Sequence, residues 1–394
     1  MFDLKLSEDL KMRMLRVQNA VRESGYDGIV LTTDVNIFYL TGLVFTGYLY
    51  LPSDNEPLWF VKRPCNLSGE RIFIVHKPEM IPEILVSQGY TLPSRVLLET
   101  DVMPFNECTR LMAALKIEMP AVGNASVLMR RLRMVKTGWE IEQFRKSALG
   151  HVATYSKIPS LYRKGMTDAR FQAEIEHVMR MNGSIGVFRF YGSGTDIFMG
   201  SLLAGANAEA ASPFDFALGG AGLTTSCPIG ANGTVLREGM AVMVDMVGNY
   251  TDYLTDMTRV YSIGRLPELA YKAHQTSIDI HAAFMEAARP AVSCASLYEL
   301  AVSIVDKAGL APYFMGTVQQ AKFVGHGIGI EINEPPVLTP RSKEALAKNM
   351  TIALEPKFVI PAVGAVGIEN SYLVTDDGVE KLTVFPEEII ELPA

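Results

Sequence analysis

The sequence predicts a two-domain protein of the mixed α/β (α+β) class, with one domain over residues 1–133 and a second over residues 134–394. A chain of 394 residues is long enough for two hydrophobic cores. Strand and helix patterns alternate before residues 131–136, where we place the boundary. After it, long helical patterns are separated by groups of strand-like segments. The two patterns together indicate the mixed class.

The first domain begins with an amphipathic helical pattern and continues with alternating elements. Amphipathic segments predict helices over residues 8–24, 79–88 and 106–116. Short apolar segments predict strands over residues 28–32, 48–51, 58–61 and 95–98. A Pro-Ser-Asp-Asn turn separates the second and third of these strands.

The second domain contains the longest helical patterns, over residues 139–162, 168–181, 267–288 and 296–308. Pro290 follows the third pattern and Gly309 ends the fourth, as expected at helix ends. Residues 192–233 are rich in glycine and have little periodicity. They lack a phosphate-loop motif, so we expect backbone that either lines a site or forms a tightly packed or dimer-forming loop.

Five ionisable residues interrupt apolar segments of this domain: Asp245, Asp256, His326, Glu355 and Glu369. Apolar neighbours on both sides indicate strands that are covered on both faces. A buried, unpaired carboxylate costs several kcal/mol, so such groups are normally paired, neutralised or bound to a cation. No cluster of Lys or Arg lies nearby in the sequence, so the set points to metal, for which divalent Mn, Fe, Co or Zn is suitable. The alternative is a set of unrelated surface acids at strand ends.

The spacing of the acids predicts two hairpins. Asp245 and Asp256 flank a turn-like segment, and a symmetric hairpin centred between Tyr250 and Thr251 would place them directly opposite each other. Like charges in opposed positions are destabilising, and a cation between them removes the repulsion. Glu355 and Glu369 are separated by an even number of residues, so both could face one side of a second hairpin. Two acidic hairpins and one histidine would form a cage for two metal ions.

The same residues carry a family resemblance. The matching segments are residues 245–259 (DMVGNYTDYLTDMTR), 325–336 (GHGIGIEINEPP), 354–357 (LEPK) and 367–374 (GIENSYLV). They resemble the successive motifs of the pita-bread metallopeptidases, a superfamily that includes methionine aminopeptidase, aminopeptidase P, prolidase and the metal-free creatinase. Residues 27–42 and 133–148 are similar to the start of the creatinase-type N-terminal domain and to the entry of the catalytic domain.

The resemblance implies a creatinase-like N-terminal α/β domain and a C-terminal pita-bread catalytic domain. It implies that Asp245, Asp256, His326, Glu355 and Glu369 bind two divalent ions. It also implies that Glu355 shuttles protons during hydrolysis of an amide bond, with His326 beside it in the catalytic group. The expected substrate is a small peptide of the Xaa-Pro type or another small-molecule amide.

Three positions depart from the family pattern. Asn333 and Cys227 lie where peptidases of this family usually carry histidines, and Gly367 lies where prolidase and aminopeptidase P usually carry arginine. We expect Asn333 to hold the substrate carbonyl or the oxyanion, or else to form an Asx turn before Pro335. Cys227 is expected either at the substrate or as a small packed hydrophobe. Arg259 is expected to pair with a nearby carboxylate, with substrate binding as the alternative.

Composition limits the function classes. A net charge of −7 argues against a nucleic-acid surface, and no apolar run is long enough to span a membrane. The N-terminus has no signal-peptide pattern, and the four scattered cysteines suit reduced thiols, so we expect a cytoplasmic protein. We also expect a homodimer. Metal-dependent amide hydrolysis is the predicted function. The alternatives are hydrolysis or lysis of a small non-peptide metabolite, and a metal-stabilised binding protein without turnover.

Overall fold

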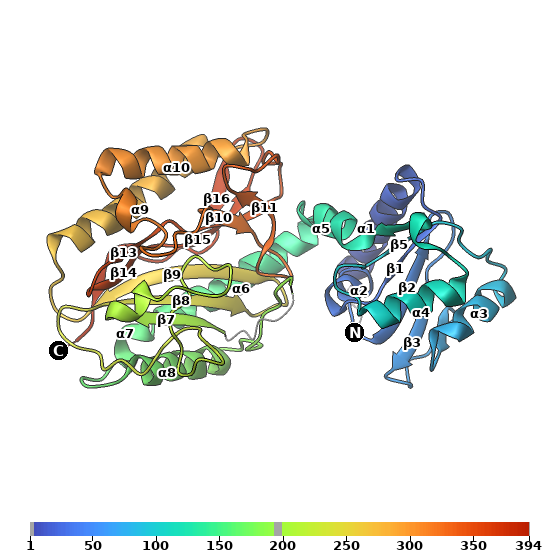
Figure 1. Ribbon diagram of the computed structural model, residues 1–394, viewed down its shortest axis with the longest axis horizontal. Coiled ribbons are helices and arrows are strands. Elements are labelled where there is room, and N and C mark those ends of the chain that lie inside the picture. Colours follow the sequence, from blue (N-terminus) through green and yellow to red (C-terminus); the bar gives the residue numbers. More distant parts are fainter. Residues whose placement is uncertain (1–3, 193–198, 394) are drawn as a thin grey trace. The chain divides into compact units, whose positions relative to one another are not determined.

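The structure, a computed structural model, describes residues 4–192 and 199–393. Contacts divide the chain into two compact units, Met1–Arg133 and Met134–Ala394, here called the N-terminal and C-terminal units. Both combine sheets with helices (Figure 1). The predicted mixed α/β class is therefore confirmed.

The N-terminal unit is built on a mixed sheet with the strand order β4-β3-β2-β1-β5-β6. The strands are β1 (Gly28–Leu31), β2 (Thr46–Pro52), β3 (Leu58–Arg63), β4 (Ile72–Ile74), β5 (Val96–Leu98) and β6 (Val122–Asn124). The helices are α1 (Leu4–Glu23), α2 (Asp34–Thr41), α3 (Ile81–Ser87), α4 (Phe105–Leu115) and α5 (Ala125–Arg133). Short 3-10 turns lie at Pro78–Met80 and Met119–Ala121.

Helix α2 was not predicted because its residues are apolar on nearly every side. Val35, Ile37 and Leu40 are all buried, so no amphipathic period marks the segment. Its ends carry the local signals instead. The Thr33 hydroxyl accepts a hydrogen bond from the Asn36 backbone, and Gly42 ends the helix in the left-handed region with φ of 73°.

The C-terminal unit contains three sheets within its described residues. Their strand orders are β17-β9-β8-β7, β11-β10-β12-β15-β16 and β13-β14. The first half of the strands comprises β7 (Gly200–Ala204), β8 (Ala241–Asn249), β9 (Leu254–Ser262), β10 (Gly325–Gly327) and β11 (Glu334–Leu338). The second half comprises β12 (Thr351–Leu354), β13 (Lys357–Ile360), β14 (Gly364–Gly367), β15 (Asn370–Val374), β16 (Val379–Lys381) and β17 (Ile390–Glu391).

Helices cover these sheets from opposite sides (Figure 1). The helices are α6 (Gly138–Tyr155), α7 (Ile158–Leu161), α8 (Asp168–Met181), α9 (Glu268–Ala287) and α10 (Cys294–Ala308), with 3-10 turns at Gly205–Glu209 and Ala311–Tyr313. Helices α6 and α8 contact β7, β8 and β9, whereas α9 contacts β13 and β14. Among the described residues, no helix combines the length and apolar character needed to cross a membrane.

Strands β8 and β9 are buried on both faces, as the unbroken apolar runs predicted. Val242 and Val244 pack with residues of α6 and α8, while Met243 and Val260 pack with α9 and α10. Strand β7 is formed by residues of the glycine-rich segment 192–233. Residues 193–198 of that segment lie outside the described residues. Gly200, with φ of 146°, lies so close to β8 that a Cβ atom would be 2.3 Å from the Asp245 carbonyl oxygen.

Candidate functional site

The first acidic hairpin is formed by β8 and β9, and its register differs from the prediction. Asp245 pairs with Thr258 and Val247 pairs with Asp256, so the two aspartates are diagonal neighbours and the predicted direct opposition is wrong. The cause is the turn, because Asp252 adopts a φ of 68° and its N–H donates to Asn249 Oδ1 at 3.1 Å. The hairpin centre moves by one residue, yet both aspartates stay on the same face.

The second acidic hairpin comprises β12 and β13 on one side and β14 and β15 on the other. Leu354 pairs with Asn370 and Lys357 pairs with Gly367. The same register runs through both pairs, so Glu355 lies opposite Glu369, where the regular strands are interrupted. The two hairpins meet at a bridge between Thr258 and Glu369, where the Thr258 hydroxyl donates to Glu369 Oε2 at 2.8 Å.

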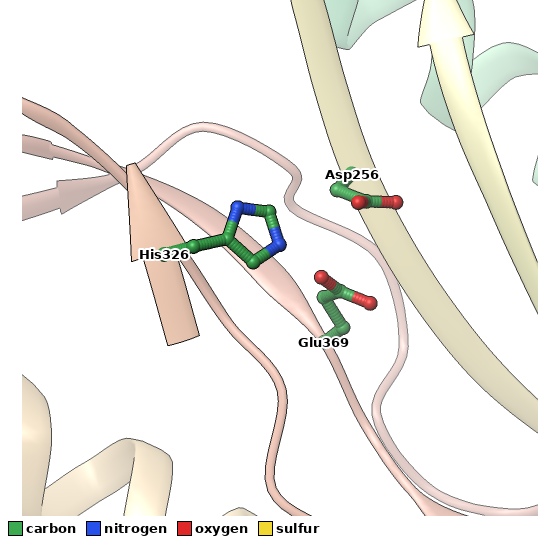
Figure 2. A group of neighbouring side chains, drawn as sticks. All are labelled: Asp256, His326 and Glu369. Carbon is green, nitrogen blue, oxygen red and sulfur yellow. The ribbon is translucent and has the colours of Figure 1, made fainter. Parts of the chain in front are cut away.

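Asp256, His326 and Glu369 converge from β9, β10 and the second hairpin (Figure 2). Each offers a ligand atom that lies within 4.8 Å of the others. Asp256 Oδ1 and Glu369 Oε1 are buried and have no hydrogen-bond partner among the described residues. Two such oxygens beside an imidazole are costly unless a cation or protons satisfy them, so this group fits a divalent ion.

Lys357 lies on the other side of the cluster, and the sequence prediction missed it. Its Nζ atom is 2.7 Å from Asp245 Oδ2, 2.8 Å from Glu355 Oε2 and 3.1 Å from Glu369 Oε2. Its side chain is only 1% exposed. The signal in the sequence was a lysine two positions after Glu355 in an apolar strand, which places both side chains on one face.

The charges divide the cluster into two parts. Burial would raise the pKa of Glu355, but the positive charge of Lys357 and a hydrogen bond with His326 lower the pKa to about 2. Burial, together with the negative charges of Glu369 and Asp245, raises the pKa of Asp256 well above its ordinary value. Burial also raises the pKa of Glu369 to about 8, although Lys357 opposes the shift. Negative charge is therefore compensated beside Lys357 and uncompensated beside Asp256.

His326 connects the two parts. Its Nδ1 atom lies 3.0 Å from the Gly327 carbonyl oxygen, and its Nε2 atom lies 3.4 Å from Glu355 Oε1. Burial would lower the pKa of His326, but the hydrogen bond with Glu355 and that residue's negative charge raise it above its ordinary value. The imidazole is held so that Nε2 faces the carboxylates, which is the orientation a metal ligand needs.

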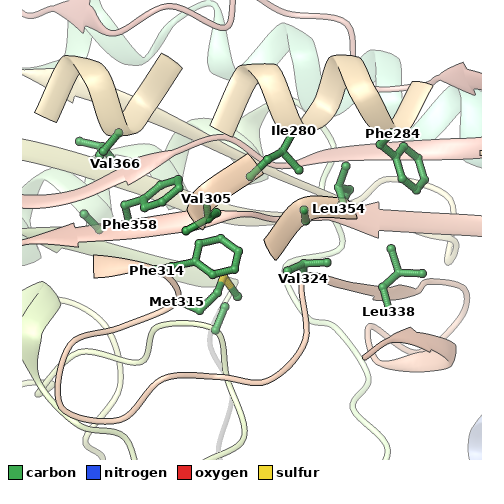
Figure 3. Packing of buried hydrophobic residues seen from close by; sticks show 14 of the residues in the cluster. Ile280, Phe284, Val305, Phe314, Met315, Val324, Leu338, Leu354, Phe358 and Val366 are labelled. Atoms are coloured by element: carbon green, nitrogen blue, oxygen red, sulfur yellow. The ribbon is translucent and has the colours of Figure 1, made fainter. Parts of the chain in front are cut away.

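Helix α9 supports the second hairpin through polar and apolar contacts. The Ser277 hydroxyl donates to the Pro356 carbonyl at 2.6 Å and accepts from the Ile368 N–H at 3.0 Å. His281 Nε2 lies 3.1 Å from the Ile368 carbonyl oxygen. Ile280 and Phe284 of the same helix pack in the cluster that contains Leu354 and Val366 (Figure 3). The helical pattern over residues 267–288 contains His281 but does not indicate this supporting contact.

Arg259 has a similar supporting role. Its guanidinium donates to the carbonyl oxygens of Thr258 and Glu369 at 2.8 and 2.9 Å and to Asn370 Oδ1 at 2.9 Å. The expected carboxylate pair is therefore replaced by contacts with backbone and amide oxygens. These contacts join the two hairpins directly behind the cluster.

The residues at the three departing positions take different roles. Asn333 Oδ1 accepts from the Tyr191 N–H at 2.8 Å, and its Nδ2 donates to the Tyr191 carbonyl at 2.9 Å, so it holds that segment in place. Cys227 is partly exposed and lines a cavity of about 210 Å³ together with residues of α8. Gly367 has a φ of 121°, and a Cβ atom there would lie 2.5 Å from the Pro356 carbonyl oxygen. A side chain at that position is incompatible with this backbone.

We expect the free energy of unfolding to fall as the pH is lowered from about 6.5 to about 4. Burial lowers the pKa of His151 and His281 to about 3 and that of His274 to about 4, from an ordinary value of 6.5. In this window the unfolded chain binds protons that the folded chain excludes. The contribution of these three histidines to stability is complete above pH 6.5 and is lost on acidification, by up to about 1.4 kcal/mol per pH unit for each histidine.

Urea denaturation at a series of pH values measures this loss. His281→Gln should flatten the slope between pH 6.5 and 4, because glutamine does not titrate. The exposed His177 lies on α8, and His177→Gln provides the matched control with the wild-type slope. An unchanged slope in His281→Gln would show that this histidine is not the protonation site.

Comparisons with known proteins cover both units. The model of metallopeptidase family M24 matches residues 142–376, and that of the creatinase/prolidase N-terminal domain matches residues 13–135. The chain is 24% identical over 389 residues to a Xaa-Pro dipeptidase of Pyrococcus furiosus, covering 97% of this chain and 100% of the relative. It is 28% identical over 295 residues to a probable dipeptidase PepE of Mycobacterium tuberculosis, covering 75% and 69%.

Solved structures show the same fold. A prolidase from Pyrococcus horikoshii superposes with a TM-score of 0.79 at 19% identity, covering 96% of this chain and all of that chain. An X-Pro aminopeptidase from Thermotoga maritima superposes with a TM-score of 0.77 at 20% identity, covering 95% and 99%. The chain therefore shares its fold with these two solved structures.

Proposed function

The chain belongs to metallopeptidase family M24, and on that premise we propose that it hydrolyses the amide bond of small peptides of the Xaa-Pro type with the help of divalent metal. Membership confirms the resemblance on which the prediction rested. The observation that carries the proposal is the convergence of Asp256, His326 and Glu369, with two buried carboxylate oxygens left without partners in the described part of the chain. Several relatives bear the name dipeptidase, which agrees with a small peptide substrate.

We assign the metal to the five residues named by the resemblance. Asp256, His326 and Glu369 would contact one ion directly, and Asp245 and Glu355 would contribute to the second ion that the resemblance implies. Mn, Fe, Co or Zn suits carboxylate and imidazole ligands, and the number of two ions remains a prediction. When bound, such an ion supplies Lewis acidity to the substrate carbonyl and lowers the pKa of a water molecule.

Glu355 is the proposed proton carrier. Its carboxylate stays ionised at neutral pH because Lys357 lies 2.8 Å away. It can therefore accept a proton from the attacking water and deliver it to the leaving amine. Lys357 holds that carboxylate in position, whereas His326 Nε2, which lies 3.4 Å from Glu355 Oε1, is the atom assigned to the ion.

The substrate contacts of Asn333 and Cys227 are also proposals. Asn333 would act through the Tyr191 segment that it holds, and Cys227 through the cavity beside α8. One observation favours a second candidate, hydrolysis or lysis of a small non-peptide metabolite. Gly367 cannot carry the arginine that the resemblance associates with prolidase and aminopeptidase P, so a substrate group that binds this arginine would lack its partner. The cytoplasmic location and the homodimer also stay predictions.

Turnover of a Xaa-Pro dipeptide panel is expected only after loading with Mn²⁺ or Co²⁺. Removing the metal with a chelator should abolish turnover and lower the melting temperature, because an ion that binds only the folded state stabilises it by about 2.7 kcal/mol at a hundred times its Kd. Dipeptides without proline serve as the specificity control. A fully loaded protein that is inactive on every peptide but cleaves a small non-peptide amide would favour the second candidate.

A further inference from the structure

We propose that the ammonium group of Lys357 takes the place of one of the two divalent ions, so that this centre binds a single ion. The proposal rests on the metal-dependent function proposed above and specifies the composition of the same site. It starts from the disagreement between the predicted two-ion cage and the cation that the chain itself supplies to that cage.

All three N–H donors of the Lys357 ammonium have a carboxylate oxygen as partner. An ammonium group has three N–H donors, and Nζ of Lys357 has three carboxylate oxygens at 2.7, 2.8 and 3.1 Å, one each from Asp245, Glu355 and Glu369. A second ion in this position would compete for the same oxygens and would be repelled by the ammonium. The space between these acids therefore does not fit a divalent ion while Lys357 remains there.

The backbone of Lys357 is fixed as firmly as its side chain. Its carbonyl accepts from the Met315 N–H at 2.8 Å, and its strand pairs with Gly367. The side chain is 1% exposed, so no solvent-facing position is open to it without movement of the strands around it. The buried ammonium is stable only beside these three carboxylates, and it in turn compensates their negative charge.

The opposite side of the cluster remains open to an ion. Glu369 is shared, because its Oε2 atom contacts Lys357 and the Thr258 hydroxyl while its Oε1 atom has no partner in the described chain. Asp256 Oδ1 is likewise buried without a partner among the described residues, and His326 completes the group. Asp245 and Glu355 thus bind the Lys357 ammonium, Asp256 and His326 form the site for a divalent ion, and Glu369 contributes to both.

Metal stoichiometry tests this division directly. After reconstitution with Mn²⁺ and removal of loosely bound metal, the wild-type protein should contain one ion per chain by elemental analysis. Its electron paramagnetic resonance spectrum should be that of an isolated Mn²⁺ ion. Lys357→Ala removes the ammonium and leaves space between the three acids, so this variant should bind two ions and show an exchange-coupled spectrum.

Lys136→Ala is the matched control. Lys136 is also 1% exposed and forms a buried ion pair with Glu334 at 2.9 Å, so the control removes a buried ammonium of the same unit without touching the cluster. It should retain one ion. The wild-type measurement does not depend on any variant and decides the question even if Lys357→Ala does not fold.

The outcomes separate this inference from the proposed function. Two coupled ions in the wild type, or a single ion in folded Lys357→Ala, would overturn the inference and leave the metal-dependent function intact. A wild-type protein that binds no Mn²⁺ or Co²⁺ would overturn both. A single ion in the wild type without any peptide turnover would support the inference and contradict the peptidase activity.

Discussion

Glu369→Ala is expected to abolish binding of the divalent ion and to lower turnover at least about a thousandfold, which corresponds to about 4 kcal/mol of transition-state stabilisation. Glu369 is the residue at which both hairpins and both halves of the cluster meet. It accepts from Thr258, contacts Lys357 and offers a ligand atom to the group that it forms with Asp256 and His326. Its removal leaves the candidate ion with two ligands.

Elemental analysis and kcat/KM measured on the same sample test this expectation. Glu380→Ala is the control, because Glu380 forms an exposed pair with Arg145 in the same unit and its loss should leave both quantities unchanged. Circular dichroism confirms that the variant is folded. A folded Glu369→Ala protein that keeps one ion and wild-type turnover would show that the catalytic metal is held by other residues.

Glu355→Gln is expected to lower turnover about a hundredfold or more while changing substrate affinity much less. Glutamine has nearly the same size and retains one oxygen, but it cannot accept and release a proton. The usual contribution of general acid–base catalysis is of this order. Burial alone would raise the pKa of Glu355, but Lys357 and His326 lower it to about 2. The wild-type group is therefore a carboxylate throughout the neutral range.

Metal content must be measured alongside kcat and KM for this variant. Under the single-ion arrangement, Glu355 contacts Lys357 and His326, and we expect Glu355→Gln to keep its ion. Glu380→Gln provides the same chemical change at an exposed position. A metallated Glu355→Gln protein with the wild-type kcat would show that the proton carrier lies elsewhere, whereas loss of the ion would mean that Glu355 is itself a ligand.

Much of the C-terminal unit and of its acidic cluster could be predicted from the sequence. Continuous apolar segments indicated which parts of the C-terminal unit form buried strands and which ionisable residues interrupt them. The order Asp245, Asp256, His326, Glu355 and Glu369 identified the family, and family membership is confirmed by the match over residues 142–376. The even spacing of Glu355 and Glu369 was also sufficient to place them on one side of their hairpin.

The supporting residues could not be found in this way. His274, Ser277 and His281 follow a helical spacing on α9, which predicts that they share a face but not what that face contacts. Their partners lie about ninety residues later in the chain, at Gly367 and Ile368. Asn333 likewise meets Tyr191 across 142 residues of chain.

The sequence by itself determined the fold class and which carboxylates and imidazole are candidate metal ligands, because side-chain period and residue type are local properties. The tertiary structure alone decided the register of the first hairpin, since the turn with positive φ at Asp252 moves the partner of Asp245 by two residues, from Asp256 to Thr258. It alone placed Lys357 among three carboxylates. A strand pattern predicts which neighbours share a face with a lysine. The carboxylates that contact this lysine also come from other strands, so they depend on how the sheets pack.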